Sequence, residues 1–103
     1  MKGDRDLSRK EHDLDYERDD ASNETESAVA DAKRDTIGWL RGNSYPVAGD
    51  WEGEPPKTDA DLDKAIAMIQ ADKAGLPEYS FFGDPNWKIA DAQIAILQWA
   101  KGT

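Results

Sequence analysis

The 103-residue sequence contains no cysteine, a single histidine and no long hydrophobic run. Without cysteine there is no disulfide framework and no thiolate metal site, which fits a reducing compartment. The apolar runs are much shorter than the roughly 20 residues that cross a bilayer, and the first residues are charged where a signal peptide would be apolar. We therefore expect a small, soluble, cytoplasmic protein.

Groups that perform catalysis are also scarce. His12 lies in a highly charged N-terminal segment that offers no partner to orient it as a base. No serine lies in a glycine-flanked nucleophile elbow, and no glycine-rich phosphate loop follows a predicted strand. Asp59, Asp61 and Asp63 have the spacing that opens a calcium loop, but Lys64 occupies the position that requires glycine. We predict no enzyme activity, no cofactor and no metal site.

Acidic residues outnumber basic ones, 22 against 13, so the net charge is −9. Such a charge repels nucleic acids and anionic membranes and attracts basic partners. Solubility alone is one explanation for the excess. The other is mimicry, in which carboxylates replace nucleic-acid phosphates on a basic surface of another protein. Under either interpretation we predict no direct binding to nucleic acid or to membranes.

Residues 1–21 form an acidic arm that is poor in apolar side chains. After Met1, its large apolar residues are Leu7, Leu14 and Tyr16, too few to offset the entropy of ordering on their own. Leu7 and Leu14 would share one side of a helix if a partner covered them. The arm is therefore predicted to be disordered or a marginal helix, followed by one helical domain over residues 22–103.

Three helices are predicted after the arm. The first covers residues 22–42, with Ser22 as its N-cap and apolar residues recurring at three- and four-residue steps. The second covers residues 58–75, with Thr58 as its N-cap. The third covers residues 84–102, starts at an Asp-Pro pair and is apolar on two adjoining faces. The expected fold class is all-α, a small three-helix domain. Its predicted core comprises Trp39, Leu62, Ile66, Ile69, Ile94 and Leu97.

Residues 43–57 are predicted to be a long irregular loop, since proline and glycine recur throughout them. A loop of this length without secondary structure is uncommon in a compact domain, which makes it a candidate for interaction with a partner. Its predicted partner-binding residues are Asp50, Trp51, Glu52 and Glu54.

The stretch LPEYSFFGDPNW, residues 76–87, contains four of the nine aromatic residues: Tyr79, Phe81, Phe82 and Trp87. One interpretation is that Phe81 and Phe82 cap the open end of the core while Tyr79 lies across it. The other is that one or two of the four aromatics are exposed as anchors of an interface. Both hold if one phenylalanine points inward while Tyr79 or Trp87 points outward. All four are predicted partner-binding residues.

The run GLPEYSFFGDPNW, followed by IADAQIAILQW, resembles the C-terminal part of small, mostly uncharacterised proteins encoded by bacteriophages. The resemblance covers roughly residues 75–99, includes no catalytic signature and transfers no functional residue to this chain. It implies a phage setting, and hence the cytoplasm of a host cell.

Charge, missing catalytic groups and the aromatic stretch together favour a non-enzymatic function. The predicted function is that of an inhibitor or adaptor that occupies a basic surface of a host protein, such as a nucleic-acid-binding surface. The alternative is a structural or assembly component that forms a homo-oligomer, or docks to a larger particle, through its last helix.

Overall fold

The computed structural model describes residues 1–42 and 55–101 of the chain, and the residues so described form four α-helices and no strand. In chain order, the helices are α1 (Asp4–Asp19), α2 (Glu24–Leu40), α3 (Asp59–Gly75) and α4 (Asn86–Trp99). The all-α class is thus confirmed, but the structure has four helices where the sequence predicted three.

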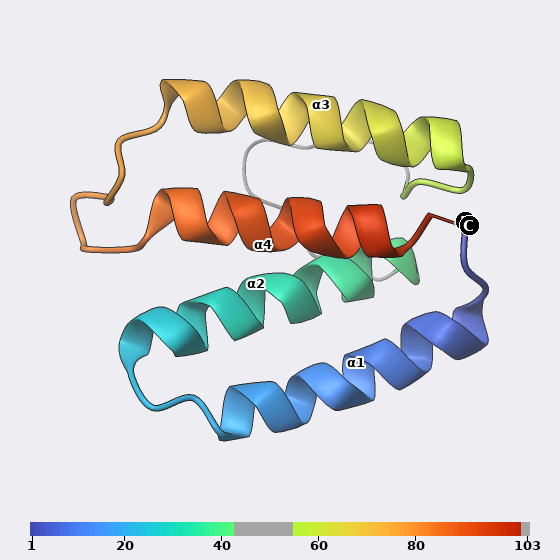
Figure 1. Ribbon diagram of the computed structural model, residues 1–103, viewed down its shortest axis with the longest axis horizontal. Helices are drawn as coiled ribbons and strands as arrows, with labels where there is room; N and C mark the ends of the chain where they lie inside the picture. The colour runs from blue at the N-terminus through green and yellow to red at the C-terminus, as the bar shows by residue number, and fades with distance from the viewer. Residues whose placement is uncertain (43–54, 102–103) are drawn as a thin grey trace.

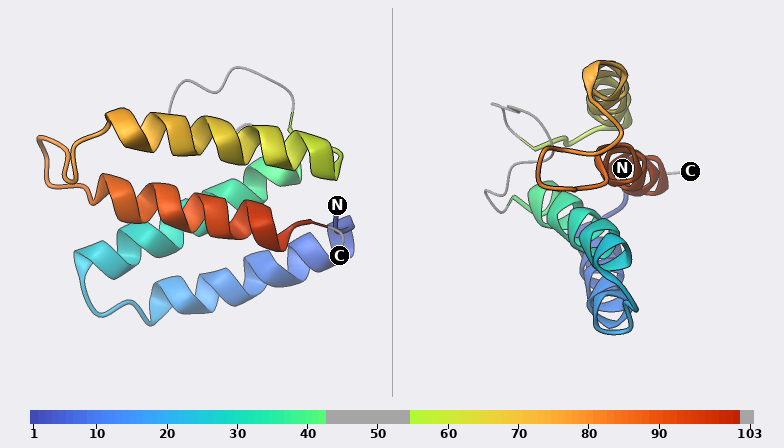
Figure 2. Two further views of the ribbon diagram at one scale, coloured as in Figure 1. Left: turned by 45° about the horizontal axis from the view of Figure 1, so that its top comes forward. Right: turned by 90° about the vertical axis from the view of Figure 1, so that its left-hand side faces the viewer.

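The four helices lie side by side in the spatial order α3, α4, α2, α1 (Figure 1). Close packing joins α3 to α4, α4 to α2, and α2 to α1. The end-on view in Figure 2 shows the same order, with α3 at one edge and α1 at the other. Among the described helices, the central pair α2 and α4 therefore has a neighbour on each side, whereas each edge helix packs on one side.

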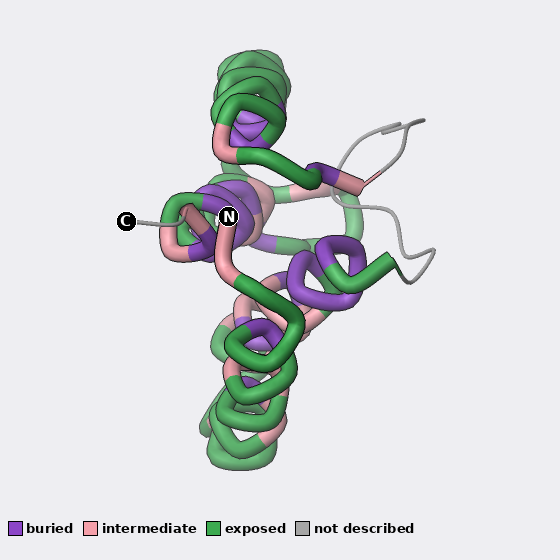
Figure 3. Tube along the Cα trace, turned by 90° about the vertical axis from the view of Figure 1, so that its right-hand side faces the viewer, coloured by how far each residue is buried: buried purple, intermediate pink, exposed green. Residues whose placement is uncertain are grey.

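The hydrophobic core follows this array. Buried residues are concentrated on the two central helices, and the edge helices are exposed over much of their surface (Figure 3). Helix α4 buries residues on both of its predicted apolar faces because it lies between α2 and α3. All six side chains predicted for the core are buried: Trp39, Leu62, Ile66, Ile69, Ile94 and Leu97.

The expectation of a disordered or marginal N-terminal arm is corrected by α1. Residues 4–19 form a helix of 16 residues, in which Leu7 and Leu14 are 3% and 2% exposed. Both leucines join the same core cluster as the side chains of the other helices. Their burial required a covering surface, and α2 of the same chain supplies it. The arm alone is too polar to fold, but it becomes ordered because it adds its two leucines to an existing core.

Ion pairs line the boundary between α1 and α2. Arg18 on α1 pairs with Asp31 on α2 at 2.9 Å. Two basic residues of α2 and the basic residue at its C-cap also form ion pairs with acidic residues of α1. These pairs are Lys33 with Glu17 at 2.9 Å, Arg34 with Asp15 at 2.7 Å, and Arg41 with both Asp4 and Glu11 at 3.1 Å. The charged side chains of α1 therefore help to set how this helix aligns with α2.

Side-chain caps define the starts of α2 and α3. Asn23, and not the predicted Ser22, is the N-cap of α2, because its side-chain oxygen accepts a hydrogen bond from the Glu26 N–H at 2.8 Å. Ser22 instead donates its N–H and its hydroxyl to the Glu26 carboxylate, at 2.8 and 2.7 Å. Thr58 caps α3 as predicted, accepting a hydrogen bond from the Asp61 N–H.

Helix α4 also begins later than predicted. Its N-cap is Pro85 in place of Asp84, and its first residue is Asn86. The Asp84 carboxylate accepts a hydrogen bond from the Ser80 hydroxyl at 3.1 Å, within the turn that precedes the helix. Most of the predicted long loop, residues 43–54, lies outside the described residues.

Candidate functional site

The aromatic segment connects α3 to α4 at one end of the molecule (Figure 1). Phe81 is 97% exposed and Phe82 is 88% exposed, while Tyr79 and Trp87 are 52% and 41% exposed. The interpretation in which Phe81 and Phe82 cap the core is therefore wrong, as is the version with one phenylalanine inside. The core needs no such cap, since α4 is already covered by α2 and α3.

A tight turn holds the two phenylalanines outward. The Ser80 carbonyl accepts a hydrogen bond from the Gly83 N–H at 2.9 Å, which leaves Phe81 and Phe82 as the two central residues of the turn. Gly83 has a φ of +88°, a conformation that a residue with a Cβ rarely adopts. The Ser80 N–H donates to the Asp84 carbonyl at 2.9 Å, and the Ser80 Oγ accepts from the Asp84 N–H at 2.9 Å.

The base of the segment is attached to both flanking helices. The Trp87 indole N–H donates a hydrogen bond to the carbonyl of Leu76 at 2.9 Å. The Asn86 side-chain amide donates to the carbonyl of Pro77 at 3.2 Å. These two bonds join the first turn of α4 to the residues that leave α3, so the segment is bonded at its base as well as at its tip.

Both phenylalanine side chains are exposed, so the chain does not gain the free energy that their burial would contribute. Burial of one such side chain contributes about 1.5–3 kcal/mol, and here neither ring is covered by the chain itself. The rings contact each other edge to face, with centroids 5.4 Å apart and planes at 89°. Because hydrogen bonds hold the turn, a partner that covered these rings would spend little free energy on ordering them.

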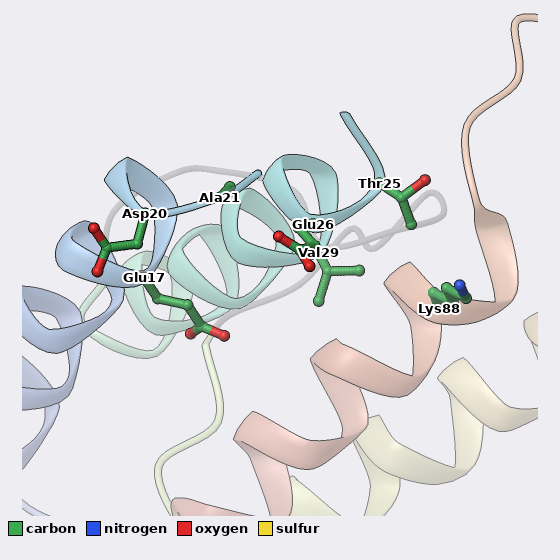
Figure 4. A pocket seen from close by; sticks show the side chains of 7 residues that line it. All are labelled: Glu17, Asp20, Ala21, Thr25, Glu26, Val29 and Lys88. Carbon is green, nitrogen blue, oxygen red and sulfur yellow. The ribbon is translucent and has the colours of Figure 1, made fainter. Parts of the chain in front are cut away.

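A pocket of about 470 Å³ lies near the same end of the molecule. Its lining comes from α1, α2, the residues between them, and α4 (Figure 4). The lining residues are Glu17, Asp20, Ala21, Thr25, Glu26, Val29 and Lys88. Lys88 directly follows Trp87 in the first turn of α4, so the pocket is adjacent to the base of the aromatic segment.

The carboxylates of this pocket are engaged to different degrees. Glu17 pairs with Lys33 through one oxygen at 2.9 Å. Glu26 accepts two hydrogen bonds from Ser22 on one oxygen, and these bonds lower the pKa of the Glu26 carboxyl below its ordinary value. Asp20 has no side-chain partner in the described part of the chain. The pocket therefore offers negatively charged acceptors beside apolar side chains.

The sequence predicted the aromatic segment as a candidate site, but it did not predict the pocket. It identified Tyr79, Phe81, Phe82 and Trp87, which the structure brings together on one turn and its base. The predicted partner-binding residues Asp50, Trp51, Glu52 and Glu54 lie outside the described residues. The pocket gave no sequence signal, because its residues come from positions 17–29 and from position 88 and meet through tertiary packing.

Over residues 1–42 and 55–101, no group of three or more His, Asp or Glu side chains is placed to hold a metal ion. His12 lies edge-on to Tyr16 on the exposed side of α1, with ring centroids 5.1 Å apart.

None of the helices in the described ranges is long and apolar enough to cross a membrane.

The chain matches no family model, and neither the curated proteins nor the solved structures include a significant match to it.

Proposed function

We propose that this chain is a non-enzymatic protein-binding protein, an inhibitor or adaptor that occupies a basic surface of another protein. The observation that carries the proposal is the exposure of Phe81 and Phe82, at 97% and 88%, on a turn closed by its own hydrogen bonds. Contiguous exposed aromatics of this kind are typical of interface anchors. The turn would fill an apolar depression on the partner.

The net charge of −9 supports a basic partner. On α1, Asp6, Asp13 and Asp19 form no ion pair within the described part of the chain, so their charge is directed to solvent. Charge of this kind acts mainly on the rate of association, whereas buried anchors act on the rate of dissociation. A surface that ordinarily binds nucleic acid is one such partner, with carboxylates in place of phosphates.

The resemblance to bacteriophage proteins makes a protein of the host cell, in its cytoplasm, the expected partner. The alternative function is a structural or assembly component that self-associates or docks to a larger particle through its last helix. It rests on the two apolar faces of α4, and these faces pack against α2 and α3 within the chain. No observation on α4 now favours it over binding through the turn.

The test is to capture a partner from host lysate and to measure its binding kinetics to variants. We expect Phe81→Ser with Phe82→Ser to speed dissociation about 30-fold, which corresponds to about 2 kcal/mol for an interface hot spot. Tyr16→Ser is the matched control, because Tyr16 is a 62% exposed aromatic residue on α1, outside the turn. Association should slow as salt is raised.

Two outcomes would contradict the proposal. If the double phenylalanine variant dissociates at the rate of the unmodified protein, the turn is not the anchor. If association does not depend on salt, the acidic charge does not guide the encounter, and the assembly alternative becomes the better hypothesis.

A further inference from the structure

The pocket beside the aromatic turn has an apolar lining and an acidic rim. Val29, Ala21 and the Thr25 side chain supply apolar atoms, and Glu17 and Glu26 supply carboxylates. Figure 4 shows Val29 between the Glu26 carboxylate and Lys88. A long cationic side chain suits such a place, because its methylene groups cover apolar atoms while its charged end meets carboxylates.

The charges at the rim leave room for one more cation. Three carboxylates and a single ammonium group belong to the residues that line the pocket, and Lys88 forms no ion pair with any of these carboxylates in the described part of the chain. Glu17 and Glu26 each use one oxygen for a partner within the chain, and Asp20 uses neither. The rim can therefore accept hydrogen bonds from an incoming donor without losing the contacts that hold the fold.

The pocket and the base of the aromatic turn are formed in part by neighbouring residues of α4. Lys88, on the rim, follows Trp87, whose indole N–H fixes the base of the turn at Leu76. In Figure 4, the chain that enters α4 passes next to Lys88. The pocket is therefore next to the residues that hold the aromatic turn at its base.

We propose that this pocket receives an arginine side chain of the protein that binds the aromatic turn. The inference rests on the proposed function, which supplies the partner. It adds that this partner presents an arginine beside the apolar depression that receives the turn. Arginine fits better than lysine, because its planar guanidinium can donate to two carboxylates at once. The occupant follows from charge complementarity, since an apolar pocket with an acidic rim rejects an acidic or a neutral polar side chain.

The test uses the isolated chain and a hexa-arginine peptide, so it does not depend on a captured partner. Amide signals of the isotope-labelled protein are followed by NMR during titration, with a hexa-citrulline peptide as the uncharged control. We expect shifts centred on Ala21, Thr25, Val29 and Lys88, and no comparable shifts with citrulline. Asp20→Lys should weaken binding about tenfold or more, the effect of one charge-assisted hydrogen bond.

The matched control is Asp13→Lys, which makes the same change of charge within α1, the helix that Asp20 follows as its C-cap. Asp13 is exposed and does not line the pocket. If both variants weaken binding equally, or if shifts spread over the acidic surface, the peptide senses net charge and the pocket inference is wrong. Equal binding of hexa-citrulline would also overturn it. Unshifted NMR signals away from the substituted residue show that each variant is folded.

Failure of this inference can be told apart from failure of the proposed function. If the phenylalanine variants release a captured partner faster while Asp20→Lys affects neither that partner nor the peptide, the function stands and the pocket inference falls. If the peptide binds in the pocket and the phenylalanine variants keep their affinity for the partner, the pocket inference stands and the turn is not the anchor.

Discussion

Lys2 and Trp99 are 97 positions apart in the chain, yet the Lys2 ammonium lies 5.0 Å from the centroid of the Trp99 ring. The same ammonium donates hydrogen bonds to the carbonyls of Trp99 and Lys101. Helix α4 has no basic residue in its last turn, so Lys2 supplies a positive charge to the carbonyl of its last residue, Trp99, and to that of Lys101 just beyond it. The N-terminal segment thereby stabilises the end of α4.

The first prediction is that α1 contributes strongly to stability through its two leucines. Leu14→Ala should lower the free energy of unfolding by about 2–5 kcal/mol, because it leaves a cavity where a fully covered side chain packed. The measurement is urea unfolding followed by circular dichroism. Tyr16→Ala is the control, since this neighbouring side chain is mostly exposed and should change stability little. Equal effects of the two substitutions would show that α1 is not docked in solution.

The ion pairs between α1 and α2 should contribute less to the stability of the fold than the two buried leucines of α1. Arg41→Gln removes the contacts to Asp4 and Glu11, both of which raise the pKa of the Arg41 guanidinium. These groups are accessible to solvent, where water and salt weaken ion pairs. We expect a shift of the unfolding midpoint much smaller than that of Leu14→Ala, and smaller still at high salt. A shift as large as that of Leu14→Ala, persisting in high salt, would contradict this ranking.

Two glycines with equally open surroundings should respond in opposite ways to alanine. A Cβ at Gly83 or at Gly75 would meet no atom within 4 Å, but Gly83 has a φ of +88° while Gly75 is the last residue of α3. Gly83→Ala should cost about 1–2 kcal/mol, because of its left-handed backbone. Gly75→Ala should be neutral or stabilise by up to about 1 kcal/mol. Thermal unfolding of both variants checks the prediction, and a neutral Gly83→Ala would contradict the turn geometry.

Glu26 should contribute to stability in a way that depends on pH. The hydrogen bonds from Ser22 lower the pKa of Glu26 from its ordinary 4.5 in the folded protein. Its contribution is therefore complete above pH 4.5 and is lost as the pH falls through the lower value of the folded state. The stability difference between the protein and Glu26→Gln should be largest near neutral pH and should shrink in acid.

Urea unfolding from neutral pH down to pH values below 4.5 measures that difference. Glu24→Gln is the control, because it removes the same charge from the first turn of α2 and leaves the bonds to Ser22 in place. A difference for Glu26→Gln that stays constant across the whole pH range would rule out the capping role.

The sequence by itself determined the elements whose signals are local. Helix α3 and its cap at Thr58 follow from apolar spacing and from a side chain that satisfies a backbone N–H nearby. The burial of Ile66, Ile69 and Leu97 follows in the same way, since a helix with an apolar stripe must cover it. The start of α2 was misplaced by one residue, because Ser22 and Asn23 are both good caps and geometry decides between them.

Only the tertiary structure decided the state of the arm, the exposure of the aromatics and the existence of the pocket. Leu7 and Leu14 are too few to fold α1 alone, and their burial depends on a surface of α2 that no local pattern specifies. Phe81 and Phe82 are apolar enough for a core, but their place at the centre of a turn directs them to solvent. The apolar character of a side chain determines how much free energy is gained when the side chain is buried. Whether another part of the chain lies close enough to cover it is settled by packing between distant residues.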